Sequence, residues 1–506
     1  MRRAAISLIV ALILSSAALA ARRGGQLEVL VVDRDTGKPL AARMHLKNAA
    51  KRPRKVPGAP FWHDHFVFDG KITLELPRGN YTFEVECGPE YAVRSGHFEI
   101  NDDADDTKKV DMKRHVDMAA EGWWAGDLHV RRPLKDLPLL MRAENLHVVH
   151  VVTWDNRHRL DRTKQTAGGP LVVLQDRRCY HTLGGVDRRA GGSLLMLGGT
   201  APVDLSGATA EFPSSLHYAR AAKKAGAWID AERIFDWDLP VWAAHGLLAS
   251  VQIANSHMHR GGVIAHEAKG KARDKLPYPG THGNARWAQQ IYFHLLNCGL
   301  RLPPSAGSAS GLVPNPVGYN RVYVFCGQDF SYQRWMKGLA AGQVVVTNGP
   351  LLRPLVEGQL PGHVFDAEAG QTLKLEIALS LATRDKIDYL EIIKNGRVVH
   401  EVPLREWAKN KGRLPPVSFK QSGWFLVRAV TNVHSTYRFA MTGPYYVEIA
   451  GKKRVSRASA KFFHDWVFER ARRLKIADTK QRKEVIAEHR AARDYFARLM
   501  DRANAE

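Results

Sequence analysis

The sequence predicts a multidomain protein that combines an α/β region with all-β domains and ends in a helical tail. Two segments, about residues 25–115 and 351–450, alternate apolar and polar residues, which is typical of half-buried β-strands. The segment between them alternates strand-like with helix-like runs, which favours a parallel α/β sheet. At 506 residues the chain is too long for one hydrophobic core, because a domain takes roughly 150 residues.

Residues 1–20 have the three parts of a secretory signal peptide. Two arginines precede an apolar run from about Ala4 to Leu14, and Ala18-Leu19-Ala20 forms a small-residue cleavage site. No later apolar stretch reaches the roughly 18 to 20 residues that cross a bilayer. We therefore expect a secreted or periplasmic protein that does not span the membrane.

The composition is strongly basic, with a formal net charge of +23. For an exported protein this charge favours acidic partners: an anionic small molecule, a sulfated or uronic polysaccharide, or cell-envelope material. A basic surface without a specific partner is the alternative. Nucleic acid is not an expected partner, because export removes the protein from it and no recognition motif is present. The oligomeric state stays open.

The four cysteines are widely scattered and show no C-x-x-C spacing of a zinc or redox site. The exported location permits one or two disulfides among them without requiring any. The sequence does not fix a pairing of Cys87, Cys179, Cys298 and Cys326.

The first β-segment, residues 25–115, contains two clear turns between alternating strands. One is the stretch Asp35–Pro39, and the other is the Pro-x-Gly turn at Pro77–Gly79. These D-x-x-T-G-x-P and L-P-x-G-x-Y phrases resemble those of the transthyretin-like, carboxypeptidase-regulatory β-sandwich. That resemblance implies a structural or binding accessory without chemistry of its own.

A His-x-His pair, His63 and His65, lies within this segment. Its ordinary interpretation is a partly exposed turn or strand edge. The spacing alone does not converge the three or four ligands that a metal needs.

The central segment, residues 118–350, predicts strands at 146–154 and 247–254. Residues 214–228 predict a helix, for which Ser215 is a plausible N-cap. Alternating β and α elements favour a barrel-type or open α/β domain, in which chemistry lies at the carboxyl ends of strands.

Beyond this region, residues 351–450 predict a second β-sandwich with a hairpin turn at Asn395-Gly396. Residues 451–506 predict a basic helical tail. The tail has one apolar face that we expect to pack on a domain or a partner chain, formed by Val485, His489, Ala492, Phe496 and Leu499.

The stretch GDLHVRR, residues 126–132, departs from a metal motif at one position. A strand that ends in His-x-His points two imidazoles to one side. Here His129 is followed by Arg131, which has donors only and cannot ligate a metal. Asp127 and His129 match the start of such a motif, whereas Arg131 does not. The stretch therefore belongs either to a metallohydrolase site or to a site that has lost its metal ligands.

The central segment resembles the PHP (polymerase and histidinol phosphatase) superfamily, and within it the exported CehA/McbA-type metallohydrolases. Those enzymes carry G-D-L-H-x-H, then T-D-H-N, then a Gly-Ser-Asp-x-His phrase, and a closing T-N-G-P. The closing motif is intact at Thr347–Pro350. The resemblance implies an α/β barrel, flanked here by the two β-sandwiches, that holds divalent ions to generate hydroxide.

The other motifs depart from the family pattern. Arg131 replaces the second histidine, and Thr153–Asn156 lacks the expected histidine unless Asp155 takes its place. The stretch Gly307–Gly311 lacks both the aspartate and the histidine. The multinuclear site of the family therefore cannot be assembled in the usual way.

A rearranged site with a single metal is one possibility. His257 and His259 form a complete His-x-His after a predicted strand, and Asp230 and Glu232 could supply a carboxylate or a general base. One zinc, manganese or iron ion, or no metal at all, is compatible with this set. The candidate metal ligands are Asp127, His129, Asp155, His257 and His259.

Arg131 also has a positive interpretation. A guanidinium beside His129, with Arg132 or Arg260, would bind carboxylate, sulfate or phosphate through paired hydrogen bonds. An ion pair between Arg131 and Asp155 is the purely structural alternative.

Two hypotheses follow from these candidates. In the first, a degenerate metallohydrolase-like site binds an anionic ligand or glycan without catalysis. In the second, a metal-dependent hydrolase acts on ester or phosphoester bonds. No G-x-S-x-G elbow, P-loop or dinucleotide fingerprint offers another chemistry.

Overall fold

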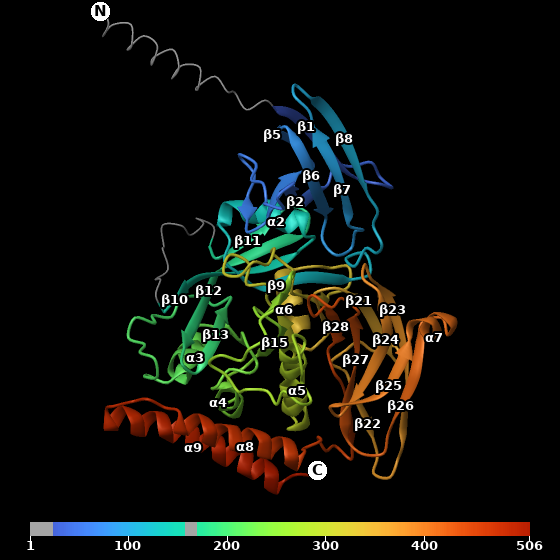
Figure 1. The fold of residues 1–506 in the computed structure, drawn as a ribbon. Helices are drawn as coiled ribbons and strands as arrows, with labels where there is room; N and C mark the ends of the chain where they lie inside the picture. Colours follow the sequence, from blue (N-terminus) through green and yellow to red (C-terminus); the bar gives the residue numbers. More distant parts are fainter. Residues whose placement is uncertain (1–23, 157–168) are drawn as a thin grey trace, which may run out of the picture. The chain divides into compact units, whose positions relative to one another are not determined.

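The computed structural model describes residues 24–156 and 169–506, apart from the side chain of Asp388. The predicted signal peptide lies outside the described residues. The chain divides into two compact units: a first unit up to Arg114 together with Arg142–Glu144, and a second unit of His115–Met141 and Asn145–Glu506. The protein is rich in strands, which form several sheets, and a pair of helices ends the chain (Figure 1).

The first unit contains two sheets that share one core. The three-stranded sheet has the order β5-β1-β8, and the five-stranded sheet has the order β3-β4-β2-β6-β7. Apolar side chains at alternate positions meet between them, including Val31, Leu46, Phe66 and Val85. The strands are β1 (Gly24–Asp33), β2 (Ala41–Asn48), β3 (Phe61–Trp62), β4 (His65–Asp69), β5 (Lys71–Pro77), β6 (Gly79–Glu86), β7 (Arg94–Ile100) and β8 (Asp105–Met112).

The turn predicted at Asp35–Pro39 follows β1 directly. The Asp33 carboxylate accepts hydrogen bonds from the backbone N–H groups of Asp35 and Thr36, at 3.0 and 2.8 Å. Gly37 has φ +71°, a conformation that glycine adopts without strain. The prediction of a turn here is confirmed.

A large mixed sheet runs through the second unit. Its central part has the order β18-β15-β14-β13-β12-β10-β9-β19-β20, and β11 pairs with β12 outside this path. The strands are β9 (Trp123–Val130), β10 (Val148–Asp155), β11 (Leu171–Leu174), β12 (Arg178–Arg189), β13 (Gly192–Leu197), β14 (Trp228–Ala231), β15 (Ser250–Ala254), β18 (Pro304–Ala306), β19 (Arg321–Phe325) and β20 (Val344–Thr347).

The directions of these strands are only partly parallel. The pairs β9-β10, β10-β12, β14-β15 and β15-β18 are parallel, but β13 is antiparallel to both β12 and β14. A short turn after Arg189 joins β12 to β13, and such a turn can only produce an antiparallel pair. As a result β9, β10, β12 and β14 all run the same way.

The strand path also returns on itself. Ser310, which follows β18 at one end of the path, forms a parallel bridge with Val130 at the end of β9. The Arg131 N–H donates to the Ser310 carbonyl at 2.7 Å. The carboxyl end of β9 therefore lies beside the segment that follows β18.

Short helices connect these strands. They are a 3-10 helix η1 (Leu134–Asp136), α2 (Leu137–Ala143), α3 (Ser215–Lys224), α4 (Leu239–Ala244), α5 (Gly283–Asn297) and α6 (Tyr332–Ala340). The prediction that Ser215 caps α3 is wrong by one residue, because the hydroxyl of Ser214 accepts the hydrogen bond from the N–H of Leu216. The Ser215 hydroxyl is buried and accepts a hydrogen bond from Trp242 instead.

The second β-rich segment continues the same sheet, because β20 pairs with β28. Asn395 and Gly396 have φ +52° and +86° and join β24 to β25, which confirms the predicted hairpin turn. A separate three-stranded sheet has the order β21-β23-β26. The elements are β21 (Leu351–Val356), β22 (Val364–Ala367), β23 (Leu373–Ala382), β24 (Ile387–Lys394), β25 (Arg397–Pro403), α7 (Leu404–Lys409), β26 (Arg413–Phe419), β27 (Gly423–Thr431), β28 (Phe439–Thr442) and β29 (Tyr445–Ile449).

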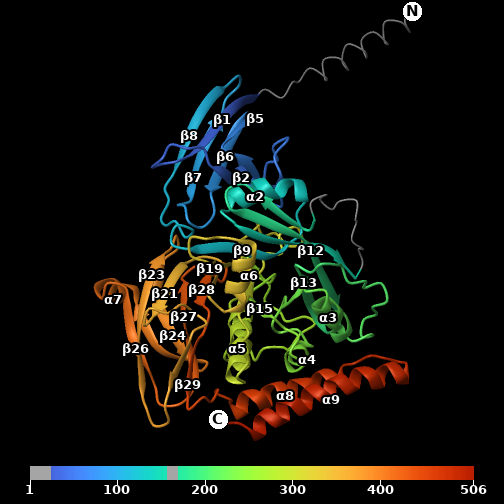
Figure 2. The ribbon, with the colours of Figure 1, turned by 180° about the vertical axis from the view of Figure 1, so that it is seen from behind.

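The tail forms two helices, α8 (Arg457–Arg472) and α9 (Thr479–Asp501), which lie side by side in both views (Figure 1 and Figure 2). They pack on α4 and α5 of the same unit. Val485, His489, Ala492 and Phe496 are buried, and Leu499 is partly buried against the same core. The predicted apolar face is confirmed, and it packs within the chain.

No disulfide joins the four cysteines, and three of them are buried. Across residues 24–156 and 169–506, no helix has both the length and the apolar composition needed to cross a membrane.

Candidate functional site

The carboxyl end of β9 carries Asp127 in a fully buried position. Its carboxylate accepts hydrogen bonds from the Ser308 hydroxyl and from the backbone N–H groups of His129, Ser308 and Gly318, the last three at 3.0, 3.0 and 2.8 Å. Burial raises the pKa of Asp127 to about 6, and these hydrogen bonds oppose the rise. The carboxylate thus fastens the segment after β18 to β9 and leaves little capacity for a metal.

The stretch Gly307–Gly311 is packed tightly against the same strand end. A Cβ on Gly307 would lie 2.6 Å from the Cβ of His129, and a Cβ on Gly311 would lie 2.3 Å from the carbonyl oxygen of Arg131. Where the resemblance expects an aspartate and a histidine, this segment supplies the Ser308 donors to Asp127. The Asp127 carboxylate is thus engaged by hydrogen bonds from this segment.

His129 is fully buried, and its Nδ1 lies 3.6 Å from Oε1 of Glu232. Neither ring nitrogen has a hydrogen-bond partner among the described residues. Burial lowers the pKa of His129 to about 4; Glu232 opposes this effect, whereas Arg131 and Arg188 add to it. The imidazole is therefore neutral at neutral pH.

Glu232, just after β14, is buried and ionised. Burial alone would raise its pKa, but Arg188 and His129 bring the pKa below the usual range of a glutamate. Arg188 Nη2 lies 2.9 Å from Glu232 Oε2. Glu232 thus lies between the guanidinium of Arg188 and the imidazole of His129. The structure therefore places two of the candidate residues, His129 and Glu232, next to each other.

Arg131 follows β9 and donates from Nη1 to Oδ2 of Asp155, at the end of β10, at 2.9 Å. Its Nε and Nη2 are buried and have no hydrogen-bond partner in the described parts of the chain. The ion pair with Asp155 matches the structural alternative for Arg131. It also engages Asp155, which was a candidate metal ligand.

Asp230 is fully buried near the end of β14 and accepts three hydrogen bonds. Oδ1 accepts from the hydroxyls of Ser250 and Ser305, at 2.6 and 2.7 Å, and Oδ2 accepts from the Gln252 amide at 2.7 Å. Burial raises the pKa of Asp230 to about 6 against these hydrogen bonds. The residue cross-links β14, β15 and β18, and the proposed role as a general base gains no support.

The second His-x-His pair is engaged with its own loop. His257 Nδ1 donates to the Ile264 carbonyl at 3.2 Å, and His259 Nε2 lies 2.8 Å from the Ser256 carbonyl. The backbone N–H of Arg260 donates to Asn315. These contacts with the backbone and with Asn315 orient the loop residues.

The structure does not gather the predicted metal ligands into one cluster. Around β9 it brings together two pairs, His129 with Glu232 and Arg131 with Asp155. In the described residues, groups of at least three possible ligands within 4.8 Å of one another occur only in the first unit.

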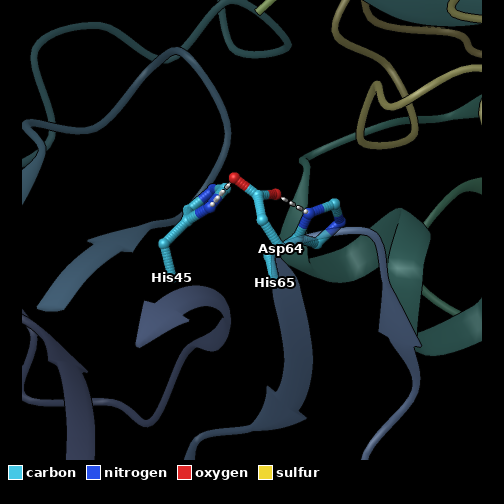
Figure 3. Close-up of side chains that lie close together, drawn as sticks. All are labelled: His45, Asp64 and His65. Atoms are coloured by element: carbon cyan, nitrogen blue, oxygen red, sulfur yellow. Dashed lines mark hydrogen bonds and ion pairs between the residues drawn. The ribbon is translucent and has the colours of Figure 1, made fainter. Parts of the chain in front are cut away.

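Buried histidine and carboxylate groups of the first unit could hold a metal ion. One group is His45, Asp64 and His65 (Figure 3), and the other is His45, Glu84 and Glu86. In the His-x-His pair of this segment, the side chain of His63 is 57% exposed at a turn, in agreement with its ordinary interpretation, and it lies outside both groups. His45 was missed because it carries no local motif, and only the pairing of β2 with its neighbours brings it to this place.

The burial of His129 has a consequence for stability. Its pKa is about 4 in the folded protein against an ordinary value of 6.5, so unfolding takes up a proton between these values. The contribution of neutral, buried His129 to the free energy of unfolding is complete above pH 6.5. It is lost as the pH falls towards 4. We expect His129→Gln to lose less stability than the wild type over this range, by about 3 kcal/mol. Urea unfolding at several pH values measures this, and equal pH slopes would contradict it.

Comparisons with known proteins give little further information. No protein-family model matches the chain, and no curated protein matches it. One solved structure, "The Bacillus anthracis TIE protein", is 21% identical over 22% of this chain and 20% of its own, with a TM-score of 0.15. The matched part therefore spans about a fifth of that protein.

Proposed function

We propose that the second unit binds an anionic group, a carboxylate, sulfate or phosphate, at the carboxyl end of β9. The single observation that carries this proposal is the free edge of Arg131. Its Nη1 is used by Asp155, while Nε and Nη2, which form the side-on fork of the guanidinium, are buried without a partner in the described chain. Such a fork matches two oxygens of one anion.

The surroundings of Arg131 support the same conclusion. A buried donor that bonds neither protein nor water costs about 1–3 kcal/mol, so two such donors on one edge favour a ligand. The neutral ring of His129 offers a further nitrogen, and Arg188 adds a second positive charge. The side chains of Arg131 and Arg188 are 18% and 35% exposed, so both lie near the protein surface.

The strand arrangement supports a PHP-like barrel as the frame of this site, with a β-sandwich on either side in sequence. The path returns from the segment after β18 to β9, and β9, β10 and β14 run in one direction. Their carboxyl ends carry Arg131, Asp155 and Glu232. Barrel enzymes and their relatives bind ligands at this end of the strands.

Binding is better supported than hydrolysis. A catalytic zinc takes three protein ligands, whereas this site offers the pair His129 and Glu232. The ligand that we propose is an anionic small molecule or an acidic glycan outside the cytoplasm, because the sequence predicts export and the net charge is +23.

The test is a comparison of Arg131→Lys and Arg131→Gln with the wild type. Calorimetry with sulfate, phosphate and polygalacturonate is expected to show binding that falls about 10- to 100-fold in both variants, because neither side chain offers the fork. Arg334→Gln removes the same charge from a largely exposed arginine of the same unit and serves as the control.

The control separates a specific site from general attraction to a basic protein. Equal weakening in Arg131→Gln and Arg334→Gln would show that only the net charge matters. Unchanged binding in both Arg131 variants would also contradict the proposal.

A further inference from the structure

Two histidines stand side by side on the outer face of the five-stranded sheet. Met44 on β2 pairs with Phe66 on β4, and both side chains belong to the core. Side chains alternate along a strand, so the adjacent His45 and His65 point together to the opposite face. Their ring centroids are 5.2 Å apart.

The turn between β3 and β4 brings a carboxylate to these rings. Trp62 pairs with His65, so His63 and Asp64 form a two-residue turn, in which His63 has φ +51°. Asp64 Oδ2 lies 3.1 Å from Nδ1 of His45, and Oδ1 lies 3.1 Å from Nδ1 of His65 (Figure 3). One ligand atom from each of the three residues lies within 4.8 Å of the others, close enough for small side-chain shifts to bring all three to one ion.

We propose that His45, Asp64 and His65 together bind one divalent transition-metal ion, and that Zn²⁺ fits the site. Two imidazole nitrogens and one carboxylate oxygen are a set that zinc prefers, and three protein ligands leave one position for water. The histidine side chains are 5% and 2% exposed, whereas that of Asp64 is 23% exposed. The open position therefore faces solvent on the side of Asp64.

The protonation states suit a metal. Burial lowers the pKa of His65 to about 3, so the ring is neutral at neutral pH. Burial would raise the pKa of Asp64, but hydrogen bonds and charge from both histidines lower it below the usual range of an aspartate. A neutral imidazole and an ionised carboxylate are the forms that ligate.

The far nitrogen of His45 has a carboxylate within reach. Nε2 is 2.9 Å from Nη1 of Arg43 and 3.9 Å from Oε1 of Glu86. When Nδ1 binds a metal, Nε2 carries the ring proton, and Arg43 must yield so that Glu86 can accept it. Carboxylates commonly orient metal-bound histidines in this way. The positive charge of Arg43 opposes the ion, so we expect weaker binding than at a closed structural zinc site.

The experiment uses the full chain without an affinity tag, stripped with chelator. Titration with Zn²⁺ is expected to show one ion per chain and a rise in Tm. Asp64→Asn and His65→Gln are expected to weaken the binding at least tenfold and to abolish the rise. His63→Gln changes an exposed histidine in the same turn and is expected to bind as the wild type does. Visible absorption of bound Co²⁺ gives a second readout of histidine ligation.

Several outcomes would overturn the proposal: no stoichiometric zinc, wild-type affinity in Asp64→Asn and His65→Gln, or equal loss in His63→Gln. Circular dichroism and the metal-free Tm show whether each variant is folded. If His65→Gln does not fold, the nearly isosteric Asp64→Asn decides. Arg131→Gln is expected to bind zinc normally, so failure of this proposal is distinct from failure of the anion site.

Discussion

Asp127→Ala is expected to lower the free energy of unfolding by about 3–5 kcal/mol. The substitution removes the acceptor of the Ser308 hydroxyl and of the backbone N–H groups of His129, Ser308 and Gly318. Each buried donor left without a partner costs about 1–3 kcal/mol, although water and local relaxation recover part of this. Urea unfolding at pH 7 measures the change.

Two further variants make this result specific. Ser308→Ala removes one donor and leaves Asp127 with three other hydrogen bonds, so we expect a loss of only about 1 kcal/mol. Asp329→Ala removes a carboxylate that is 81% exposed and is expected to change stability by less than about 0.5 kcal/mol. If Asp127→Ala were as mild as Asp329→Ala, the anchoring role of Asp127 would be wrong.

Asp127 also shows what the sequence could and could not predict about the site. The motif pointed to the right residue, at the end of a buried strand, and to its neighbours His129 and Arg131. It could not show that Ser308 and Gly318, 181 and 191 residues further along the chain, occupy the carboxylate. The metal role was predicted from residue types, whereas the hydrogen bonds that Asp127 accepts depend on partners distant in sequence.

The same distinction applies to the fold. Turns with local signals were predicted well: Asp33 with Thr36, and Asn395 with Gly396, form their turns from neighbouring residues alone. The antiparallel strand β13 was not predicted, although Gly191-Gly192 in the short connection after Arg189 is a turn signal. One such connection changes a parallel sheet into a mixed one.

The cluster of His45, Asp64 and His65 was beyond the reach of motif analysis for a related reason. The sequence offers His63 and His65 at the spacing of a strand, but a turn lies between them and sends His63 outward. The partner of His65 is His45, and the register of β2 against β4 determines that partnership. A contact of this kind can be recognised only when the register of the paired strands is known.

Arg470 anchors the helical tail in a way that no sequence pattern suggested. The side chain leaves α8 and is almost fully buried between two acidic residues. Nε donates to Asp238 at 2.6 Å, and Nη1 and Nη2 both donate to Glu211. Burial would lower the pKa of Arg470, but the two carboxylates raise it, so the guanidinium stays charged.

Arg470→Met is therefore expected to destabilise the protein by about 3–5 kcal/mol, because it leaves two buried carboxylates without their cation. Arg472→Met removes an exposed arginine from the same helix and is expected to cost less than about 0.5 kcal/mol. Thermal and urea unfolding of both variants measure the difference. Similar stability of the two would contradict the anchoring role.

The origin of this loss can be tested by removing the stranded charges. Adding Glu211→Gln and Asp238→Asn to Arg470→Met is expected to recover much of the stability, since the penalty comes from uncompensated charge more than from lost packing. For the same reason the deficit of Arg470→Met should shrink as the pH falls, because protonation neutralises the stranded Asp238 carboxylate. No recovery in the triple variant would show instead that the packing of the Arg470 side chain holds α8 in place.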